Sequence, residues 1–376
     1  MTKYLRGLAV LGVLALVVTA CGSRPTESNE SEGSGGEKPA ADAKDFRACM
    51  VSDSGGFDDK SFNQTSYKGL QDAVSEYGIA ESTAESDSDG DYPENISGMV
   101  NAKCNAIITV GFKLGNQTAI AAAENPDVKF GIVDFDINAV DLEEVKLDKA
   151  PTNVKSLLFD TAQSSFLAGY LAAGMSQTGK VGTFGGLPIP TVTIFMDGFS
   201  EGVAYYNEQK GKDVQLLGWN DKTQKGLFTN DFENKGMGRN TATNLISQGA
   251  DIIFPVAGPA GLGGLQAAKA SGGKVNAIWV DTDGCKSAAE YCSVLLTSVY
   301  KGMDVAVKNV ITTTYEDKFD NTPYVGTLEN KGTGLSPYHE WDSKIPAELK
   351  AEIEEIEQQI IDGTIPIESK AVPQAQ

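Results

Sequence analysis

The sequence is poor in the residues that enzymes most often use for acid–base and nucleophilic chemistry. It has a single histidine, His339, and lacks the H-E-x-x-H motif of zinc hydrolases. Its one match to the G-x-S-x-G pattern of serine hydrolases, Gly198 to Gly202, falls inside the helix predicted over 192–208 and not at the strand-to-helix turn that the motif requires. A lone histidine without a recognisable nucleophile is more often a surface residue than a catalytic base. We therefore expect a protein that is not an enzyme and that needs no cofactor.

Positive charge is also scarce. The chain carries 31 lysine and arginine residues against 51 aspartate and glutamate residues, for a formal net charge of −20. Binding to nucleic acid depends on neutralising phosphates with lysine and arginine. This composition argues against a nucleic-acid partner, whereas a neutral small ligand meets no such barrier.

The N-terminal apolar run, Leu8 to Val18, is shorter than the roughly 20 residues that a membrane-spanning helix needs. It follows Lys3 and Arg6, and it ends in Val-Thr-Ala-Cys, which resembles a bacterial lipobox. We predict a lipoprotein signal peptide over residues 1–20 and lipidation at Cys21, so that the mature protein is anchored on the extracytoplasmic face of the cell membrane. The alternatives are an ordinary secretory signal and a buried helix.

Residues 21–44 contain the lipidated cysteine and then a stretch rich in Ser, Glu, Gly and Pro. Such a composition buries too little apolar surface to fold. We predict a disordered tether that separates the anchor from the folded part.

Cysteine is limited to five residues, without a C-x-x-C motif or a Cys/His cluster, which argues against a metal site. With Cys21 assigned to the anchor, four cysteines remain for disulfides in an oxidising compartment. Three connectivities are open, and the simplest pairs Cys49 with Cys104 and Cys285 with Cys292.

Beyond residue 45, short apolar runs alternate with helical patterns, which predicts parallel sheets covered by helices on both faces. There are too many β-α units for one sheet, so we expect an α/β protein of two doubly wound lobes joined by a hinge. The first lobe would span 45–160 plus about 284–330, and the second 161–283 plus about 331–370. The predicted strands are 46–51, 106–110, 128–133, 154–159, 180–184, 214–218, 251–256 and 276–280, and the predicted helices are 61–77, 116–124, 161–176, 192–208, 238–248, 261–270 and 347–361.

Residues that follow the first strand carry the first candidate site. Ligands of open parallel sheets bind outside the carboxyl ends of the strands, and Asp53 lies at such an end. The loop that follows contains Asp59 and Ser61, which suit helix caps, and then Phe62 and Asn63. A phenyl ring and an amide suit a planar ligand that forms hydrogen bonds, although local packing is the simpler alternative.

Acidic residues also end two later strands. Asp134 closes one, and Asp281 and Asp283 close another. Each alone could be a cap or turn residue, but their repetition favours a site that accepts hydrogen bonds from a hydroxyl-rich ligand.

Two further segments have compositions that are typical of binding loops, one rich in glycine and one rich in aspartate. The glycine-rich run from Gly258 to Gly264 opens a helix after a strand, but it matches neither the dinucleotide fingerprint nor the phosphate-binding P-loop. Its backbone amides could still donate to a ligand. The acidic run from Asp87 to Asp91 lacks the glycine and glutamate of a calcium loop, so we expect a solvated loop and no metal site.

Several segments together resemble the basic membrane protein family of lipoproteins, which includes purine nucleoside receptors of ABC transporters. The most specific are Asp-Ser-Gly-Gly-Phe-Asp-Asp-Lys-Ser-Phe-Asn at 53–63 and Gln-Ser-Ser-Phe-Leu-Ala-Gly-Tyr-Leu-Ala-Ala at 163–173. The others are 110–112, 125–134, 180–186, 197–199, 254–258, 280–283 and 297–301. The resemblance implies a fold similar to type I periplasmic binding proteins, which close two lobes on a ligand.

The resemblance also implies a ligand and partners: a nucleoside, expected to be a purine nucleoside, and an ABC transporter permease that receives it from a monomeric binding protein. Phe62 together with Phe199 or Phe228 would contact the base, and Asn63 and Asp134 would bind its edge. The sugar would be held by Asp53, Asp281 or Asp283, and Lys301, with a backbone contact from Gly258.

Two other functions fit the same fold. One is binding of a free sugar or a furanose signal, which would require aromatic walls without an amide that reads a base. The other is a surface adhesin or sensor with no transport role, which would bind no small ligand.

Overall fold

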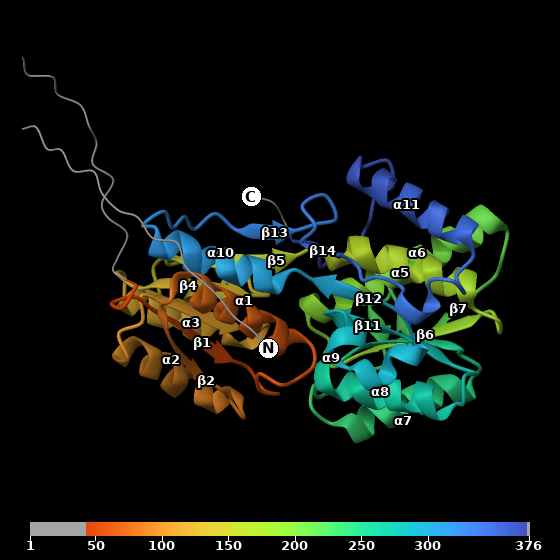
Figure 1. Cartoon of the computed structure of the whole chain (residues 1–376), viewed down its shortest axis with the longest axis horizontal. Coiled ribbons are helices and arrows are strands. Elements are labelled where there is room, and N and C mark those ends of the chain that lie inside the picture. Colours follow the sequence, from red (N-terminus) through yellow and green to blue (C-terminus); the bar gives the residue numbers. More distant parts are fainter. Residues whose placement is uncertain (1–42, 374–376) are drawn as a thin grey trace, which may run out of the picture. The chain divides into compact units, whose positions relative to one another are not determined.

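The computed structural model describes residues 43–373, which form two α/β lobes, each built on a six-stranded sheet (Figure 1). The predicted signal peptide, Cys21 and nearly all of the predicted tether lie outside the described residues. No helix in the described range combines the length and apolar character needed to cross a membrane. The predicted architecture of two doubly wound lobes is confirmed.

The sheet of the first lobe has the strand order β13-β5-β4-β3-β1-β2, and all its neighbouring strands are parallel. Its strands are β1 (Arg47–Ser52), β2 (Ala80–Ala84), β3 (Ala106–Val110), β4 (Lys129–Val133), β5 (Val154–Phe159) and β13 (Tyr324–Gly326). Its helices are α1 (Phe62–Tyr77), α2 (Tyr92–Asn101), α3 (Gly115–Glu124), α4 (Leu142–Val145) and α10 (Met303–Tyr315).

Strand β1 shows why both faces of this sheet are covered. Its alternate residues Ala48 and Met50 join the apolar cluster that includes α1 and α10, whereas Cys49 and Val51 join the cluster that includes α2 and α3. Successive side chains of a strand point to opposite faces, so a strand that is apolar throughout must be covered on both sides.

The sheet of the second lobe has the order β14-β12-β11-β10-β6-β7, and only β14 runs antiparallel to its neighbour. Its strands are β6 (Lys180–Gly185), β7 (Gln215–Leu217), β10 (Ile252–Val256), β11 (Asn276–Asp281), β12 (Leu295–Lys301) and β14 (Thr333–Leu335), with a separate pair β8 (Trp219–Asn220) and β9 (Lys225–Gly226). Its helices are α5 (Thr161–Met175), α6 (Pro190–Lys210), α7 (Lys235–Ser247), α8 (Gly258–Ala270), α9 (Gly284–Ser287) and α11 (Ala347–Ile361). Short 3₁₀ helices are η1 (Asp89–Asp91), η2 (Phe112–Leu114), η3 (Ile137–Ala139), η4 (Ala289–Val294) and η5 (His339–Trp341).

The ends of several helices follow from single residues. Helices α1 and α6 end at Gly78 and Gly211, which adopt left-handed backbone angles with φ of 67° and 61°. Glycine adopts this conformation without a steric penalty and so stops a helix. A proline in the first turn begins both α6 and α8, where its missing N–H costs nothing.

The chain crosses between the lobes at Asp160, again after Lys301, and a third time between β13 and β14. The prediction that the first lobe resumes at about residue 284 is wrong, because β12 pairs with β11 and belongs to the second sheet. The second lobe therefore continues to Lys301. The short helices α9 and η4 lie between these two strands of the second sheet, so the chain does not leave the lobe near Asp283.

Both disulfides take the simplest of the three connectivities. Cys49 on β1 is bonded to Cys104, which lies just before β3, and Cys285 on α9 is bonded to Cys292 on η4. The predicted pairing is confirmed.

Candidate functional site

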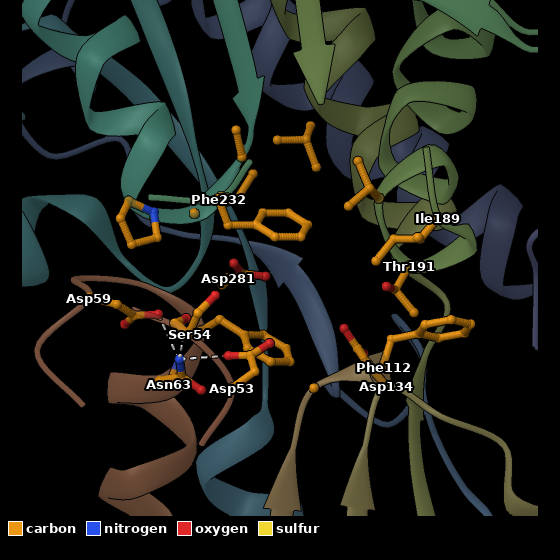
Figure 2. A pocket seen from close by; sticks show the side chains of 18 of the residues that line it. Asp53, Ser54, Asp59, Asn63, Phe112, Asp134, Ile189, Thr191, Phe232 and Asp281 are labelled. Carbon is orange, nitrogen blue, oxygen red and sulfur yellow. Dashed lines mark hydrogen bonds between the residues drawn. The ribbon is translucent and has the colours of Figure 1, made fainter. Parts of the chain in front are cut away.

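The carboxyl ends of several strands in both sheets open onto one cavity, which encloses about 720 Å³ of empty space when the part open to solvent is included. Its walls come from both lobes (Figure 2). The lining residues are Asp53, Ser54, Asp59, Phe62, Asn63, Gly111, Phe112, Lys113 and Asp134 from the first lobe, and Ile189, Thr191, Val192, Phe195, Phe232, Val256, Ala257, Gly258, Pro259, Val280, Asp281 and Lys301 from the second.

The loop before α1 is shaped by Asp59. Its carboxylate accepts backbone N–H groups from Ser61 at 2.9 Å, Asn63 at 2.9 Å and Gln64 at 3.0 Å. Burial raises the pKa of Asp59 to about 6, and these bonds partly oppose the rise. Asp59 thus caps the helix as predicted, whereas the side chain of Ser61 caps nothing and instead donates to Asp281 of the second lobe at 2.7 Å.

Buried Asn63 and half-buried Asp53 form a pair at the first-lobe wall. The Nδ2 group of Asn63 donates to Oδ1 of Asp53 at 2.9 Å. Burial raises the pKa of Asp53 to about 8; the bond from Asn63 opposes this rise, while repulsion from Asp59 and Asp134 adds to it. A carboxyl group with this pKa is mostly protonated at pH 7, so it can donate a hydrogen bond as well as accept one.

Lys301 connects two carboxylates from different lobes. Its ammonium group lies 2.5 Å from Oδ2 of Asp134, which follows β4, and 3.8 Å from Oδ1 of Asp281, which ends β11. The lysine side chain is only 3% exposed. Burial raises the pKa of both acids, and the charge of Lys301 opposes that rise. The three groups form a buried cluster that can accept and donate hydrogen bonds to hydroxyl groups.

Phenyl rings form the apolar part of the walls. Phe62 and Phe112 come from the first lobe, and Phe195 and Phe232 from the second. Figure 2 shows the ring of Phe232 across the cavity from Asp53 and Asn63. The ammonium of Lys301 lies 5.2 Å from the ring centre of Phe62 and 5.1 Å from that of Phe195, within the range of cation–π attraction.

The prediction of Phe199 or Phe228 as the second ring is corrected by the structure. Phe199 is fully buried in the core of the second lobe, where it packs on Phe254 with 5.0 Å between ring centres. Phe228 packs edge-on against Trp219, and neither residue lines the cavity. The rings that do are Phe195, one helical turn before Phe199 on α6, and Phe232, four residues after Phe228.

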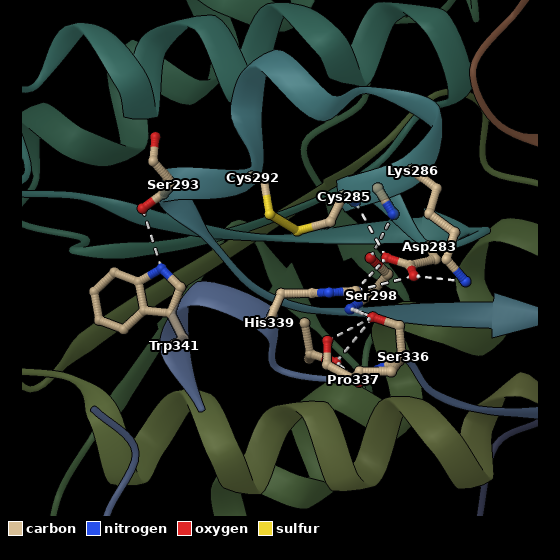
Figure 3. Close-up of a disulfide and its surroundings, with 12 residues drawn as sticks. Asp283, Cys285, Lys286, Cys292, Ser293, Ser298, Ser336, Pro337, His339 and Trp341 are labelled. Carbon is tan, nitrogen blue, oxygen red and sulfur yellow. Dashed lines mark hydrogen bonds and ion pairs between the residues drawn. A yellow bond between two sulfur atoms is a disulfide. The ribbon is translucent and has the colours of Figure 1, made fainter. Parts of the chain in front are cut away.

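The structure also separates Asp281 from Asp283. Asp281 lines the cavity, but Asp283 accepts the backbone N–H of Cys285 and caps α9. Its carboxylate pairs with His339 at 3.0 Å and Lys286 at 3.4 Å (Figure 3). The predicted role of Asp283 in the site is therefore wrong. Cys285 lies beside Asp283 and His339, but its sulfur is bonded to Cys292.

The remaining predicted residues Asp53, Phe62, Asn63, Asp134, Gly258 and Lys301 all line the same cavity. Phe112, Thr191, Phe195 and Phe232 also line the cavity, although they were not among the predicted residues. Phe112 could have been found, since it lies just beyond the end of β3. Phe232 lies in an irregular segment between β9 and α7 and carries no pattern that marks it.

Comparisons with known proteins agree with this geometry. The family model for Bmp, "ABC transporter substrate-binding protein PnrA-like", matches residues 46–371. A CD4+ T-cell-stimulating antigen of Listeria innocua is 31% identical over 390 residues, covering 98% of this chain and 100% of that protein. The ABC transporter nucleoside-binding protein BmpA of Lactococcus lactis is 28% identical, covering 97% and 99% of the two chains.

Among solved structures, a solute-binding protein of an ABC transporter system from Aeropyrum pernix superposes with a TM-score of 0.75. It is 24% identical and covers 88% of this chain and 94% of its own. This likeness concerns the fold, which is that of type I periplasmic binding proteins.

Proposed function

This chain belongs to the Bmp family of PnrA-like ABC transporter substrate-binding proteins, and we propose that it captures a nucleoside, with a purine base, and delivers it to an ABC transporter permease. Members of the family bind substrates for transport, so the chain is a binding protein and not an enzyme. The observation that carries the proposal is that phenyl rings and a buried carboxylate–ammonium cluster share one cavity between the lobes.

The base would lie between phenyl rings that come from different lobes, with Phe62 on one side and Phe232 on the other. Stacking of a base on an aromatic side chain contributes about 1–3 kcal/mol. Asn63 and Asp134 would bind the edge of the base, and Asp53, which is bonded to Asn63, would hold a hydroxyl group of the sugar. A purine offers nitrogen acceptors and an exocyclic group on its edge, which suits such a mixed set of donors and acceptors.

The ribose would lie against Lys301 and Asp281. A hydroxyl group both donates and accepts hydrogen bonds. The carboxylate of Asp281 can accept from a ribose hydroxyl, and the ammonium group of Lys301 can donate to one. The backbone N–H of Gly258, at the start of α8, adds a donor of partial positive charge. A ligand that lacks these hydroxyls would leave buried polar groups unsatisfied, which costs about 1–3 kcal/mol.

The test is titration calorimetry on residues 44–376 with inosine, adenosine, guanosine and free ribose. We expect nucleosides to bind with micromolar or tighter affinity and ribose to bind far more weakly. Phe232→Leu should weaken nucleoside binding about tenfold, because it removes a stacking ring but keeps apolar volume. Phe228→Leu is the matched control four residues away and should change affinity less than twofold.

Two results would overturn the proposal. Binding of ribose without nucleosides would favour the free-sugar function. Equal losses in Phe232→Leu and Phe228→Leu would mean that the ring of Phe232 does not contact the base.

We also infer that the protein acts outside the cytoplasm, anchored through a lipid on Cys21. The charged start, the short apolar run and the small residues before Cys21 support this. An anchored position beside the membrane would keep the bound ligand close to the permease.

A further inference from the structure

Two hydrogen bonds link strand β11 of the second lobe to the ligand-facing loop of the first. The indole Nε1 of Trp279 donates to the backbone carbonyl of Lys60 at 3.2 Å. The hydroxyl of Ser61 donates to Oδ2 of Asp281 at 2.7 Å. Trp279 and Asp281 are two residues apart on the same strand, so their side chains share one face of β11 and bind consecutive residues of the loop, Lys60 and Ser61.

The bond between Ser61 and Asp281 is buried, since Ser61 is fully buried and Asp281 is 7% exposed. The bond from Trp279 joins a fully buried indole to the half-buried Lys60. A buried donor or acceptor that loses its partner costs the desolvation of that group, and this applies to the indole N–H of Trp279 and to the pair of Ser61 and Asp281. Because each bond joins atoms from different lobes, a shift of about 1 Å between the lobes would break it.

The loop that makes these two bonds is also held by hydrogen bonds of its own. Asp59 holds the N–H groups of Ser61, Asn63 and Gln64, and Lys60 has a positive φ of 64°. A contact at the Lys60 carbonyl is thus transmitted directly to Phe62 and Asn63, which begin α1 and line the cavity.

The bond from Ser61 also orients a ligand-facing acid. It occupies one carboxylate oxygen of Asp281, while the other oxygen lies 3.8 Å from the ammonium of Lys301. Without Ser61 the carboxylate of Asp281 is free to rotate away from the cavity.

We propose that Trp279 and Ser61 are positioning residues that lock the Asp59–Asn63 loop onto β11, so that closure of the lobes and orientation of Phe62, Asn63 and Asp281 toward the ligand occur together. This inference rests on the proposed function, because its readout is nucleoside binding. Neither Trp279 nor Ser61 lines the cavity, so both residues would act on the ligand only through the loop and Asp281.

The experiment compares Trp279→Phe with Trp341→Phe. Each substitution keeps an aromatic ring and removes one indole N–H that donates to a backbone carbonyl. For Trp341 the acceptor is the carbonyl of Ser293 at 3.1 Å (Figure 3), and neither of these two residues lines the cavity. Inosine association and dissociation are followed by surface plasmon resonance or stopped-flow. A lock that forms after encounter acts on dissociation, so Trp279→Phe should raise the dissociation rate about fivefold to tenfold and change the association rate less than twofold.

Trp341→Phe should leave both rates within twofold of the wild type. Ser61→Ala should reproduce the faster dissociation, and it keeps the proposal testable if Trp279→Phe does not fold. In the double variant Ser61→Ala and Trp279→Phe, the two effects should combine to less than their product, because both variants release the same loop.

The proposal is overturned if Trp279→Phe and Ser61→Ala lower the melting temperature but leave the dissociation rate of inosine unchanged, which would be a purely structural role. Failure of the proposed function gives a different result, since the wild-type protein would then show no nucleoside binding at all.

Discussion

Asp134 and Asp281 occupy equivalent places in the two lobes. Each follows or ends a buried parallel strand, and each has a positive φ, of 65° and 66°. Aspartate tolerates this left-handed conformation better than most residues. The turn directs both carboxylates toward Lys301, so that one ammonium group serves an acid from each lobe.

Asp53 is also an acid that follows a strand, and its raised pKa predicts how the stability of the folded protein changes with pH. Its pKa is raised from 3.8 to about 8 in the folded protein, so between about pH 4 and pH 8 the folded state keeps a proton that the unfolded state releases. The contribution of Asp53 to the free energy of unfolding therefore falls as pH rises through this range. Asp53→Asn removes the titrating group, so we expect a flatter dependence on pH.

Urea unfolding at pH 5, 6, 7 and 8 measures this difference. The control is Asp58→Asn, which changes an exposed carboxylate in the same loop and should follow the wild-type curve. If the free energies of unfolding of Asp53→Asn and of the wild type change in parallel across this pH range, the pKa of Asp53 is not raised.

At the scale of elements, helices α5 and α6 are packed backbone to backbone. A Cβ added at Gly169 of α5 would meet the carbonyl oxygen of Phe199, and one added at Gly198 or Gly202 of α6 would meet a carbonyl oxygen of α5. This close approach explains why the segment Ser-Ser-Phe-Leu-Ala-Gly-Tyr-Leu-Ala-Ala is rich in small residues. It also holds α6, which carries Phe195 to the cavity.

We predict that Gly198→Ala lowers the free energy of unfolding by about 1–3 kcal/mol, since the added methyl group forces apart two packed helices. Gly98→Ala on α2 is the control, because no atom lies within 4 Å of its added Cβ. This control should be neutral or should stabilise the protein by up to about 1 kcal/mol, because alanine has a higher helix propensity than glycine. Similar losses in the two variants, measured by chemical denaturation, would contradict the packing argument.

The element pattern also explains which parts of the fold could be predicted. Strands β1, β3 and β10 are short and mostly apolar, and their positions are predicted from the sequence with small errors at the ends. Strand β2 was missed because it alternates between intermediate and exposed residues at the sheet edge. Strand β12 was missed because Thr297 and Ser298 interrupt its apolar run; both are buried and bonded to Ser336.

At the scale of the whole molecule, the cavity lies beside the crossings between lobes. Lys301 is the last residue of β12, and the next residues, Gly302 and Met303, enter the first lobe. Asp160 marks another crossing at the end of β5. The cross-lobe pair of Lys301 and Asp134 is therefore next to a segment that must bend when the lobes move.

A whole-molecule prediction concerns the anchor. Cys21→Ala should move the protein from the membrane fraction to the soluble fraction, because the acyl chains that give durable anchoring would be absent. Nucleoside affinity of the folded part should stay unchanged, since the cavity is built from residues 53 onward. Immunoblots of separated fractions measure the shift, and an unchanged membrane fraction would argue for an ordinary secretory signal or another mode of attachment.

The sequence by itself determined the alternation of strands and helices and the acids at the strand ends. It also determined that a phenyl ring and an amide, those of Phe62 and Asn63, follow Asp53. These features depend only on local periodicity and on the position of a residue after a strand. The sequence could not determine which phenyl rings reach the cavity, or which of Asp281 and Asp283 does. Those choices depend on the rotation of α6, the path of the segment before α7 and the cap of α9. Only packing between elements distant in the chain decides such orientations, and it is this packing that brings Lys301 to Asp134 and Trp279 to Lys60.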